Sequence, residues 1–251
     1  MLPVLFIGHG VPTNAIESNE YTKAWKKIAS SFPTPNAILC ISAHWLKEGT
    51  AITAMGKPKT IHDFYGFPPE LYRVHYPAPG SPEIAKSIQK SIKTVPIQLD
   101  QEWGLDHGTW SVLVHMYPHA NIPVLQLSLD YELPLEKMFQ LGKELAALRK
   151  KSILIIGSGN LVHNLMTMKP DAKPYLWAVQ FDAFIKENIA SGNYKQLLQY
   201  AQHPDAMTAH PTNDHLLPLF YILGAAGKSK PEYFCEKIEY GSVSMRSVVF
   251  R

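Results

Sequence analysis

AILCIS, at residues 37–42, is an unbroken apolar run, and it is followed at once by Ala43, His44 and Trp45. A strand that is apolar at every position is typical of a parallel sheet covered by helices on both faces, because neither side meets water. Similar runs occur at residues 3–8 (PVLFIG), 124–129 (VLQLSL) and 153–156 (ILII), with further β-rich runs at 50–55 and 95–99. These runs predict the strands of a mainly parallel sheet.

Helical patterns separate the strands. Residues 15–30, 81–91, 134–150, 175–190 and 216–223 carry apolar side chains at helical spacing or as a continuous apolar segment. Strands that alternate with helices indicate an α/β fold. We predict a single domain over residues 1–251, with a mainly parallel central sheet flanked by helices and a closing strand at 242–250.

Composition excludes several classes of protein. The net charge is +3 over 251 residues, and no basic cluster is longer than the triplet Arg149, Lys150 and Lys151, so no nucleic-acid partner is expected. No apolar run is long enough to cross a bilayer, and the apolar start at 2–7 is too short for a signal peptide. The two distant cysteines, Cys40 and Cys235, fit a reducing compartment. We expect a cytoplasmic protein without membrane contact.

One long segment has no regular pattern. Residues 56–80 contain five prolines and several aromatic side chains, which predicts an ordered loop rather than a helix or strand. Loops of this length in compact domains are often parts of binding sites.

Histidines follow several of the predicted strands. His9 follows the run at 3–8, His44 follows the run at 37–42, and His163 lies just past the run at 153–156, whereas His215 opens the helix at 216–223. Ligands bind outside the carboxyl ends of the strands in an open α/β sheet, so these imidazoles are expected to meet. Imidazole is a common ligand for zinc and iron, and three such ligands leave positions open for catalysis. The sequence predicts one divalent metal in an open site.

Other interpretations of these residues were weighed. A single histidine after a strand is more often a surface or hydrogen-bonded residue than a ligand, so the metal hypothesis depends on several occurring together. Gly157-Ser158-Gly159 lacks the further residues of a dinucleotide fingerprint, a P-loop or a nucleophile elbow, and is interpreted as a tight turn that brings His163 toward the site.

An ordered set of motifs is recognisable at this point. GHG (8–10), SAHW (42–45), LDHGTW (105–110), GSGNLVHN (157–164) and HPTNDHLLPL (210–219) together resemble the class III, LigB-type, extradiol ring-cleavage dioxygenases. DFYGFP (63–68) and YPAPGSP (76–82) are similar to the 4,5-DOPA extradiol dioxygenase subgroup. The resemblance spans nearly the whole chain.

The resemblance implies a mononuclear non-haem iron(II) held by His9, His44 and His215. His163 would be the acid–base histidine or a fourth ligand, and His107 would contact substrate or oxygen. The expected partners are a small aromatic diol, such as DOPA, and O2, and the product is a semialdehyde. His210 is a weaker candidate for the substrate site. Phe64, Tyr65 and Phe67 of the long loop are expected to form an apolar wall for the ring.

Two rival interpretations stay open on sequence grounds. An all-histidine ligand set also suits zinc, so zinc is the alternative cofactor and a zinc hydrolase on the same fold is the alternative enzyme. A non-catalytic metal-binding protein is the third interpretation, but a structural site would require neither His163 nor His107. The identity of the catechol is not readable from the chain, and a homo-oligomer is compatible with it.

Overall fold

The computed structural model describes residues 1–251 and is built on an eight-stranded sheet. The strand order is β5-β3-β7-β2-β8-β1-β12-β9. The strands are β1 (Val4–Gly8), β2 (Ala37–Lys47), β3 (Thr50–Thr53), β5 (Ile97–Asp100), β7 (Val124–Asp130), β8 (Ile153–Gly159), β9 (Pro231–Phe234) and β12 (Ser247–Phe250). The predicted strands at 3–8, 37–42, 124–129 and 153–156 are all present, but β2 continues to Lys47 and β8 to Gly159. The predicted tight turn at Gly157-Ser158-Gly159 is therefore wrong, because these residues pair with β1 as part of β8.

Four neighbouring strands form the parallel centre of the sheet. β2 pairs in parallel with both β7 and β8, and β8 pairs in parallel with β1. Antiparallel strands lie only toward the edges, where β3 meets β7 and where β12 meets β1 and β9. The α/β fold with a mainly parallel central sheet is therefore confirmed, and the carboxyl ends of β1, β2 and β8 share one edge.

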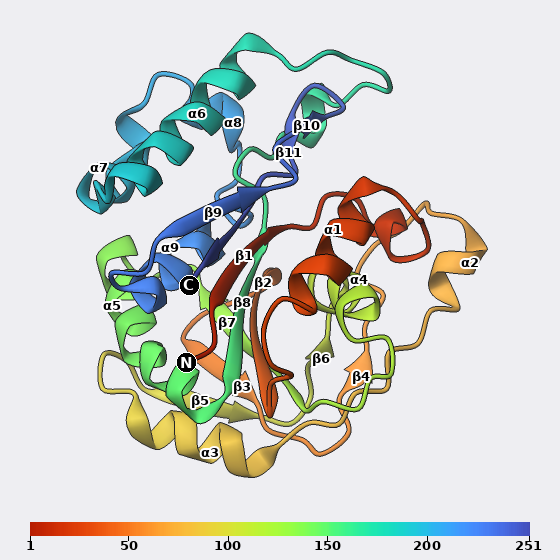
Figure 1. Ribbon diagram of the computed structural model, residues 1–251, viewed down its shortest axis with the longest axis vertical. Helices are drawn as coiled ribbons and strands as arrows, with labels where there is room; N and C mark the ends of the chain where they lie inside the picture. The colour runs from red at the N-terminus through yellow and green to blue at the C-terminus, as the bar shows by residue number, and fades with distance from the viewer.

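Helices cover both faces of this sheet (Figure 1). α5 (Leu135–Leu145) and α9 (Leu217–Ala226) lie on one face, and α1 (Glu20–Ala29) and α4 (His107–Met116) lie on the other. Successive side chains of a strand point to opposite faces, so Leu39 and Ile41 enter the core under α9 while Ile38 and Cys40 enter the core under α4. This double burial explains why the run at 37–42 is apolar throughout.

The remaining elements complete the two ends of the molecule. α3 (Pro82–Ser91) begins after Ser81, which caps it by accepting from the backbone N–H of Ile84. At the opposite end, α6 (Leu176–Ser191), α7 (Tyr194–Leu198) and α8 (Ala206–Ala209) lie together with the short pair β10 (Ile238–Glu239) and β11 (Val243–Ser244) (Figure 1). Short 3-10 turns occupy Pro12–Ala15, Ala146–Lys151, Leu165–Thr167 and Tyr200–Gln202.

Two predicted elements are interrupted at residues whose side chains make local or long-range polar contacts. The expected helix at 15–30 starts only at Glu20, because the Asn19 side chain caps α1 and Thr22 completes the capping box. The expected closing strand at 242–250 divides into β11 and β12 around Arg246, which turns to bind the buried carboxylate of Asp182 at 2.6 Å.

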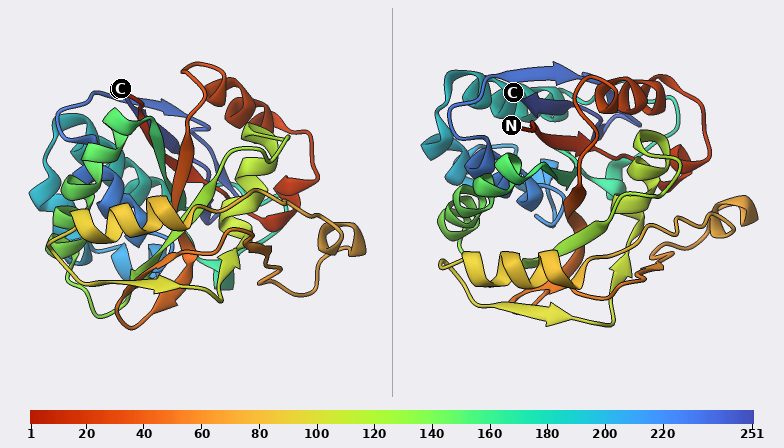
Figure 2. Two further views of the ribbon diagram at one scale, coloured as in Figure 1. Left: turned by 90° about the horizontal axis from the view of Figure 1, so that it is seen from below. Right: turned by 60° about the horizontal axis from the view of Figure 1, so that its bottom comes forward.

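The long loop at 56–80 is ordered, as predicted, but it contains two short elements. β4 (Lys59–Thr60) pairs with β6 (Gly104–Leu105), and α2 (Pro69–Tyr72) forms a single turn. Figure 2 shows α2 projecting from the body of the molecule. The loop is therefore anchored at its start and extends outward at its middle.

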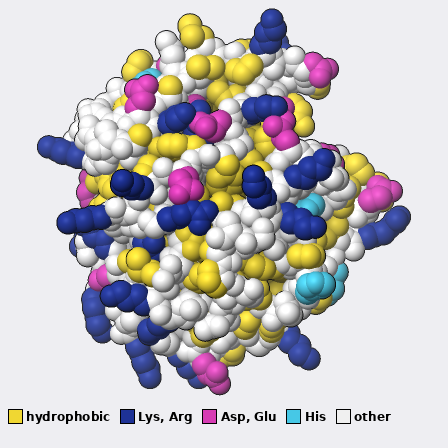
Figure 3. All heavy atoms as spheres, viewed as in Figure 1, with side chains coloured by type: hydrophobic (Ala, Val, Ile, Leu, Met, Phe, Trp, Pro, Cys, Tyr) yellow, Lys and Arg dark blue, Asp and Glu magenta, His cyan; other side chains and the backbone are white.

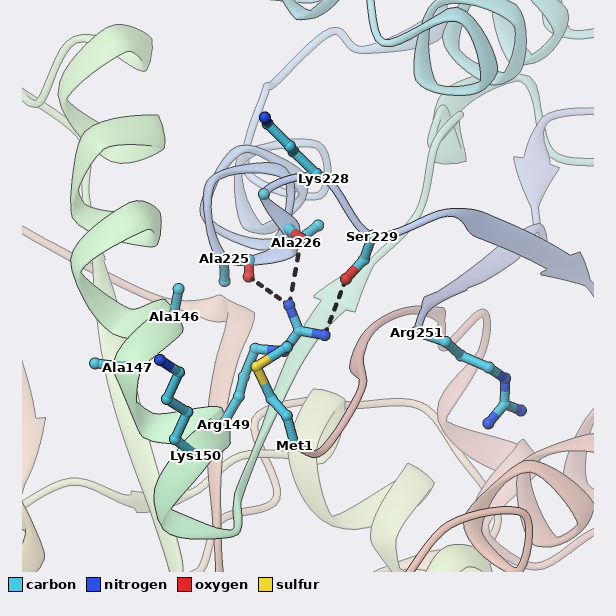
Figure 4. Close-up of a pocket in the computed structure, with 11 residues that line it drawn as sticks. Met1, Ala146, Ala147, Arg149, Lys150, Ala225, Ala226, Lys228, Ser229 and Arg251 are labelled. Carbon is cyan, nitrogen blue, oxygen red and sulfur yellow. Dashed lines mark hydrogen bonds between the residues drawn. The ribbon is translucent and has the colours of Figure 1, made fainter.

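A pocket of about 540 Å³ lies between the start of β1 and the end of α9, and none of the predicted site residues lines it (Figure 4). Its Arg149 guanidinium is buried and donates to the carbonyls of Leu2, Ala225 and Ala226 and to Ser229. These bonds satisfy carbonyls at the carboxyl end of α9, where a cation is also favoured by the helix dipole. The arginine serves the fold rather than a ligand.

The surface agrees with the weak net charge. Lys and Arg side chains are scattered over the face seen in Figure 3 instead of gathering in one patch. No helix combines the length and the apolar character that a membrane crossing requires.

Candidate metal centre

Five histidines gather at the carboxyl edge of the parallel strands. The ring centroids of His9, His44 and His215 are 5.0 to 5.2 Å apart in every pair. The His107 ring lies 3.9 Å from that of His44, and the His163 ring stacks on that of His215 at 3.4 Å. The structure thus brings together all five imidazoles that the sequence selected.

His9 is held by the neighbouring strand. Its backbone N–H donates to Gly159 at 3.1 Å, and its Nδ1 lies 3.0 Å from the Ser158 hydroxyl. The Ser158 hydroxyl donates its own proton to the carbonyl of Gly108, so it can only accept from His9. Nδ1 of His9 therefore carries the proton, and its Nε2 is left with a free lone pair.

His44 was expected just after a strand, and the structure corrects this. β2 continues to Lys47, but its pairing with β7 is irregular between Ile41 and Leu46, so His44 lies in a bulge inside the strand. A bulge bends the strand and redirects a side chain. Here the Nε2 atom of His44 faces the Nε2 atom of His9 at 3.2 Å.

His107 is placed by a helix start. Asp106 caps α4 by accepting from the backbone N–H of Thr109, so His107 becomes the first helical residue. Gly108 follows because a Cβ there would come within 2.9 Å of the His44 ring and 2.5 Å of Ser42. The motif LDHGTW is thus the start of a helix that packs directly against the histidines at the carboxyl edge of the sheet.

His215 is held against the end of β8. Its carbonyl accepts from the backbone N–H of Asn160 at 2.9 Å, and a Cβ on Gly159 would lie 2.1 Å from that carbonyl. Its Nδ1 binds the carboxylate of Asp214. A carboxylate only accepts, so the His215 Nε2 also keeps a free lone pair.

His163 is oriented differently from the other four. Its backbone forms a bridge with Val243 and donates to Ala209, which fixes its position between β8 and α8. Its ring lies nearly parallel to the His215 ring, at an angle of 8°. It is held by packing on a neighbouring imidazole.

These residues fit a divalent metal. Zinc–nitrogen bonds are about 2.0–2.1 Å long, so two ligand nitrogens of one metal are roughly 3 Å apart, and their rings about 5 Å. The Nε2 pair of His9 and His44 and the three ring separations agree with this. The sets His9, His44 and His107, and His163, Asp214 and His215, each place one ligand atom per residue within 4.8 Å of the others.

Of the remaining predicted residues, some lie beside the five histidines and others do not. Phe64 packs edge-on against His107 at 5.5 Å, and Phe67 packs against Phe64 at 5.4 Å. Tyr65 is 92% exposed and contacts neither ring. His210 is buried; its Nε2 binds the Leu161 carbonyl at 2.9 Å and its Nδ1 has no partner.

Sequence reasoning gave no role to the groups that orient the rings. Ser158, Asp214 and Asp63 accept from histidine Nδ1 atoms, as supporting groups around a metal commonly do. All three lie inside the recognised motifs, Ser158 in GSGNLVHN, Asp214 in HPTNDHLLPL and Asp63 in DFYGFP, which was the available signal. The motifs do not show which histidine each of them would bind.

Burial keeps these imidazoles neutral. Desolvation, followed by repulsion between neighbouring rings, holds the pKa of His9 and of His215 well below the ordinary value of 6.5. Desolvation also lowers the pKa of His44 to about 3 and the pKa of His163 and His210 to about 4. Neutral imidazole is the form that binds metal.

The metal-free protein is expected to lose stability in mild acid. The unfolded chain takes up protons near pH 6.5, whereas the folded histidines take them up only near pH 4 or below, so the unfolding free energy falls as pH falls through this window. Each histidine contributes a slope of about 1.4 kcal/mol per pH unit. Urea unfolding at pH 7, 6 and 5 measures it. His210→Gln should make the unfolding free energy less steep in pH by the contribution of one histidine, about 1.4 kcal/mol per pH unit. An unfolding free energy that does not change from pH 7 to 5 would contradict this explanation.

A parallel sheet whose carboxyl edge holds neutral imidazoles with free Nε2 atoms defines an α/β protein built to bind a divalent metal through histidine. The family model described as the catalytic LigB subunit of aromatic ring-opening dioxygenase matches residues 7–251. The chain belongs to this family and is an oxidoreductase of the extradiol dioxygenase kind.

Relatives of known name agree. The chain is 47% identical to the 4,5-DOPA dioxygenase extradiol of Escherichia coli K12, over 98% of this chain and 94% of that protein. It is 38% identical to the 4,5-DOPA dioxygenase extradiol of Beta vulgaris, over 98% and 95%. A crystal structure of an uncharacterized protein from Escherichia coli K12 superposes with a TM-score of 0.88 at 42% identity and covers both chains fully.

Proposed function

We propose that this protein opens the ring of a catechol such as DOPA with O2 at a mononuclear non-haem metal, giving a semialdehyde, and that residues 1–251 act as one catalytic domain. Iron(II) is the metal that this reaction calls for. The names of the two relatives, both 4,5-DOPA dioxygenases, support the substrate class.

One observation carries the proposal. Acceptors bind Nδ1 of His9 and of His215, and the Asp63 carboxylate lies 3.4 Å from Nδ1 of His44, so the Nε2 atoms of these three rings, about 5 Å apart, are the nitrogens available to a metal. Three neutral ligands leave further positions open, as a catalytic centre requires. We assign His9, His44 and His215 as the metal ligands.

A metal held by His9, His44 and His215 would supply Lewis-acid and electron-transfer chemistry for a catechol and O2. His163 lies against ligand His215 and stays neutral at pH 7, because burial lowers its pKa to about 4. A neutral imidazole nitrogen can take a proton from a catechol hydroxyl and return it later. We assign His163 as the acid–base residue rather than a ligand, with His107 as the second histidine facing the substrate.

The long loop provides the apolar side of the site. Phe64 packs against His107, and Phe67 packs against Phe64. The two phenyl rings would form an apolar surface that suits a flat aromatic substrate. Tyr65 points to solvent, so its place in the wall stays a prediction, as does a substrate contact from buried His210.

Zinc chemistry is the second candidate, and the ligand set is the observation that favours it. Three uncharged nitrogens suit zinc as well as iron, and a zinc-bound water would support hydrolysis with His163 as the proton carrier. Such an enzyme would work without oxygen.

The test is anaerobic reconstitution with iron(II) and, separately, with zinc, followed by DOPA or simple catechol and then oxygen. Oxygen uptake and the yellow absorbance of the semialdehyde are recorded together. Iron-dependent uptake with colour is the expected result. No uptake with any catechol, from a protein that retains zinc tightly, would overturn the proposal in favour of the hydrolase.

A further inference from the structure

We propose that Asp63 is a positioning residue that orients two active-site histidines, His44 and His107, with a single carboxylate. The inference rests on the proposed metal centre and adds to it a residue of the long loop. Asp63 lies three residues after β4, on a segment that is distant in sequence from both histidines.

Both oxygens of the Asp63 carboxylate are used. Oδ2 lies 2.8 Å from Nδ1 of His107 and 3.4 Å from Nδ1 of His44. Oδ1 accepts from the backbone N–H of His107 at 2.8 Å, at the first turn of α4. A carboxylate has no proton to donate, so the His107 ring must present its Nδ1 proton to Oδ2 and keep a free lone pair on Nε2. The same negative charge 3.4 Å from Nδ1 of His44 favours the same form of that ring.

The carboxylate is held rigidly. The backbone N–H of Ile61 donates to the Leu105 carbonyl at 2.7 Å, and the Trp110 indole donates to the Ile61 carbonyl at 2.7 Å. These bonds fasten the loop, two residues before Asp63, to the segment that leads into α4 and to α4 itself.

The other two acceptors each serve one ring. Ser158 binds only His9 among the imidazoles, and Asp214 binds only His215, whereas Asp63 binds His107 and lies 3.4 Å from Nδ1 of His44. An amide of the same shape cannot replace it. Asparagine would direct its NH2 group either at the Nδ1 atoms of the two rings or at the backbone N–H of His107, and both orientations set donor against donor.

The experiment compares Asp63→Asn with Glu70→Gln. Glu70 is an exposed acid of the same loop, so its replacement removes the same charge without touching a histidine. Zn²⁺ affinity is measured by competition with a chelating dye, after thermal unfolding has checked both variants. We expect D63N to bind Zn²⁺ about 10- to 100-fold more weakly, as is typical when a supporting carboxylate is lost, and E70Q to stay within about twofold.

A second measurement needs no variant to fold. Proton–nitrogen NMR of the metal-free wild-type protein reports which nitrogen of each imidazole is protonated. His44 and His107 are expected in the form with the proton on Nδ1. Both rings protonated on Nε2, or D63N affinity equal to wild type, would overturn the inference. Wild-type protein that binds neither Zn²⁺ nor Fe²⁺ would instead overturn the proposed metal centre, so the two failures are distinguishable.

Discussion

His215→Ala is expected to abolish both stoichiometric metal binding and ring cleavage. The change removes one of the three proposed ligands, and the two that remain, His9 and His44, are too few to hold a metal tightly. Metal-ion catalysis contributes several kcal/mol of transition-state stabilisation, so the rate should fall by about 10³-fold or more. No other change proposed here has a larger expected effect.

Metal content after dialysis and oxygen uptake with a catechol measure this effect. His119→Ala is the matched control, because His119 is exposed and lies outside every motif at the centre. Thermal unfolding of both metal-free variants separates lost ligation from lost folding. One equivalent of tightly bound metal in H215A would show that His215 is not a ligand.

His163→Ala is expected to slow ring cleavage by about 10²- to 10⁴-fold while the protein keeps one equivalent of metal. The ring stacks on His215 and stays neutral at pH 7, which suits proton transfer beside the metal. Substrate affinity should change little, because the catechol is held by other groups. The loss should therefore appear in kcat rather than in KM.

Steady-state kinetics across pH, together with metal analysis, decide the role of His163. In the wild-type protein, kcat should fall at low pH as the essential base becomes protonated. The variant should lose this dependence of kcat on pH. Metal content that falls together with the rate would contradict the acid–base assignment and identify His163 as a fourth ligand instead.

The strands and the meeting of the histidines could be predicted because both follow from burial and direction. Continuous apolar runs mark strands covered on both faces, and parallel strands carry whatever follows them to one edge, as with His9 and His163. The start of α1 at Glu20 was missed because the apolar periodicity extends back past the Asn19 cap. The division of the last strand at Arg246 depends on Asp182, a partner far away in sequence.

The finer geometry of the site could not be predicted from local patterns. Nothing in SAHW distinguishes a strand that ends before His44 from one that continues through a bulge. The path of the long loop determines that Asp63 reaches two imidazoles and that Tyr65 faces solvent, and that path depends on backbone bonds such as the one from Ile61 to Leu105. Proline content predicted a loop there but not its course.

The three assigned ligands come from very different points along the chain. His9 and His44 leave the ribosome early, whereas His215 is made only after the strands that support all three, β7 and β8 among them. A nascent chain therefore offers an incomplete and weak site until synthesis is nearly finished. Metal loading must follow assembly of the sheet, and a chain that stops before residue 215 is expected to leave biosynthesis without its metal.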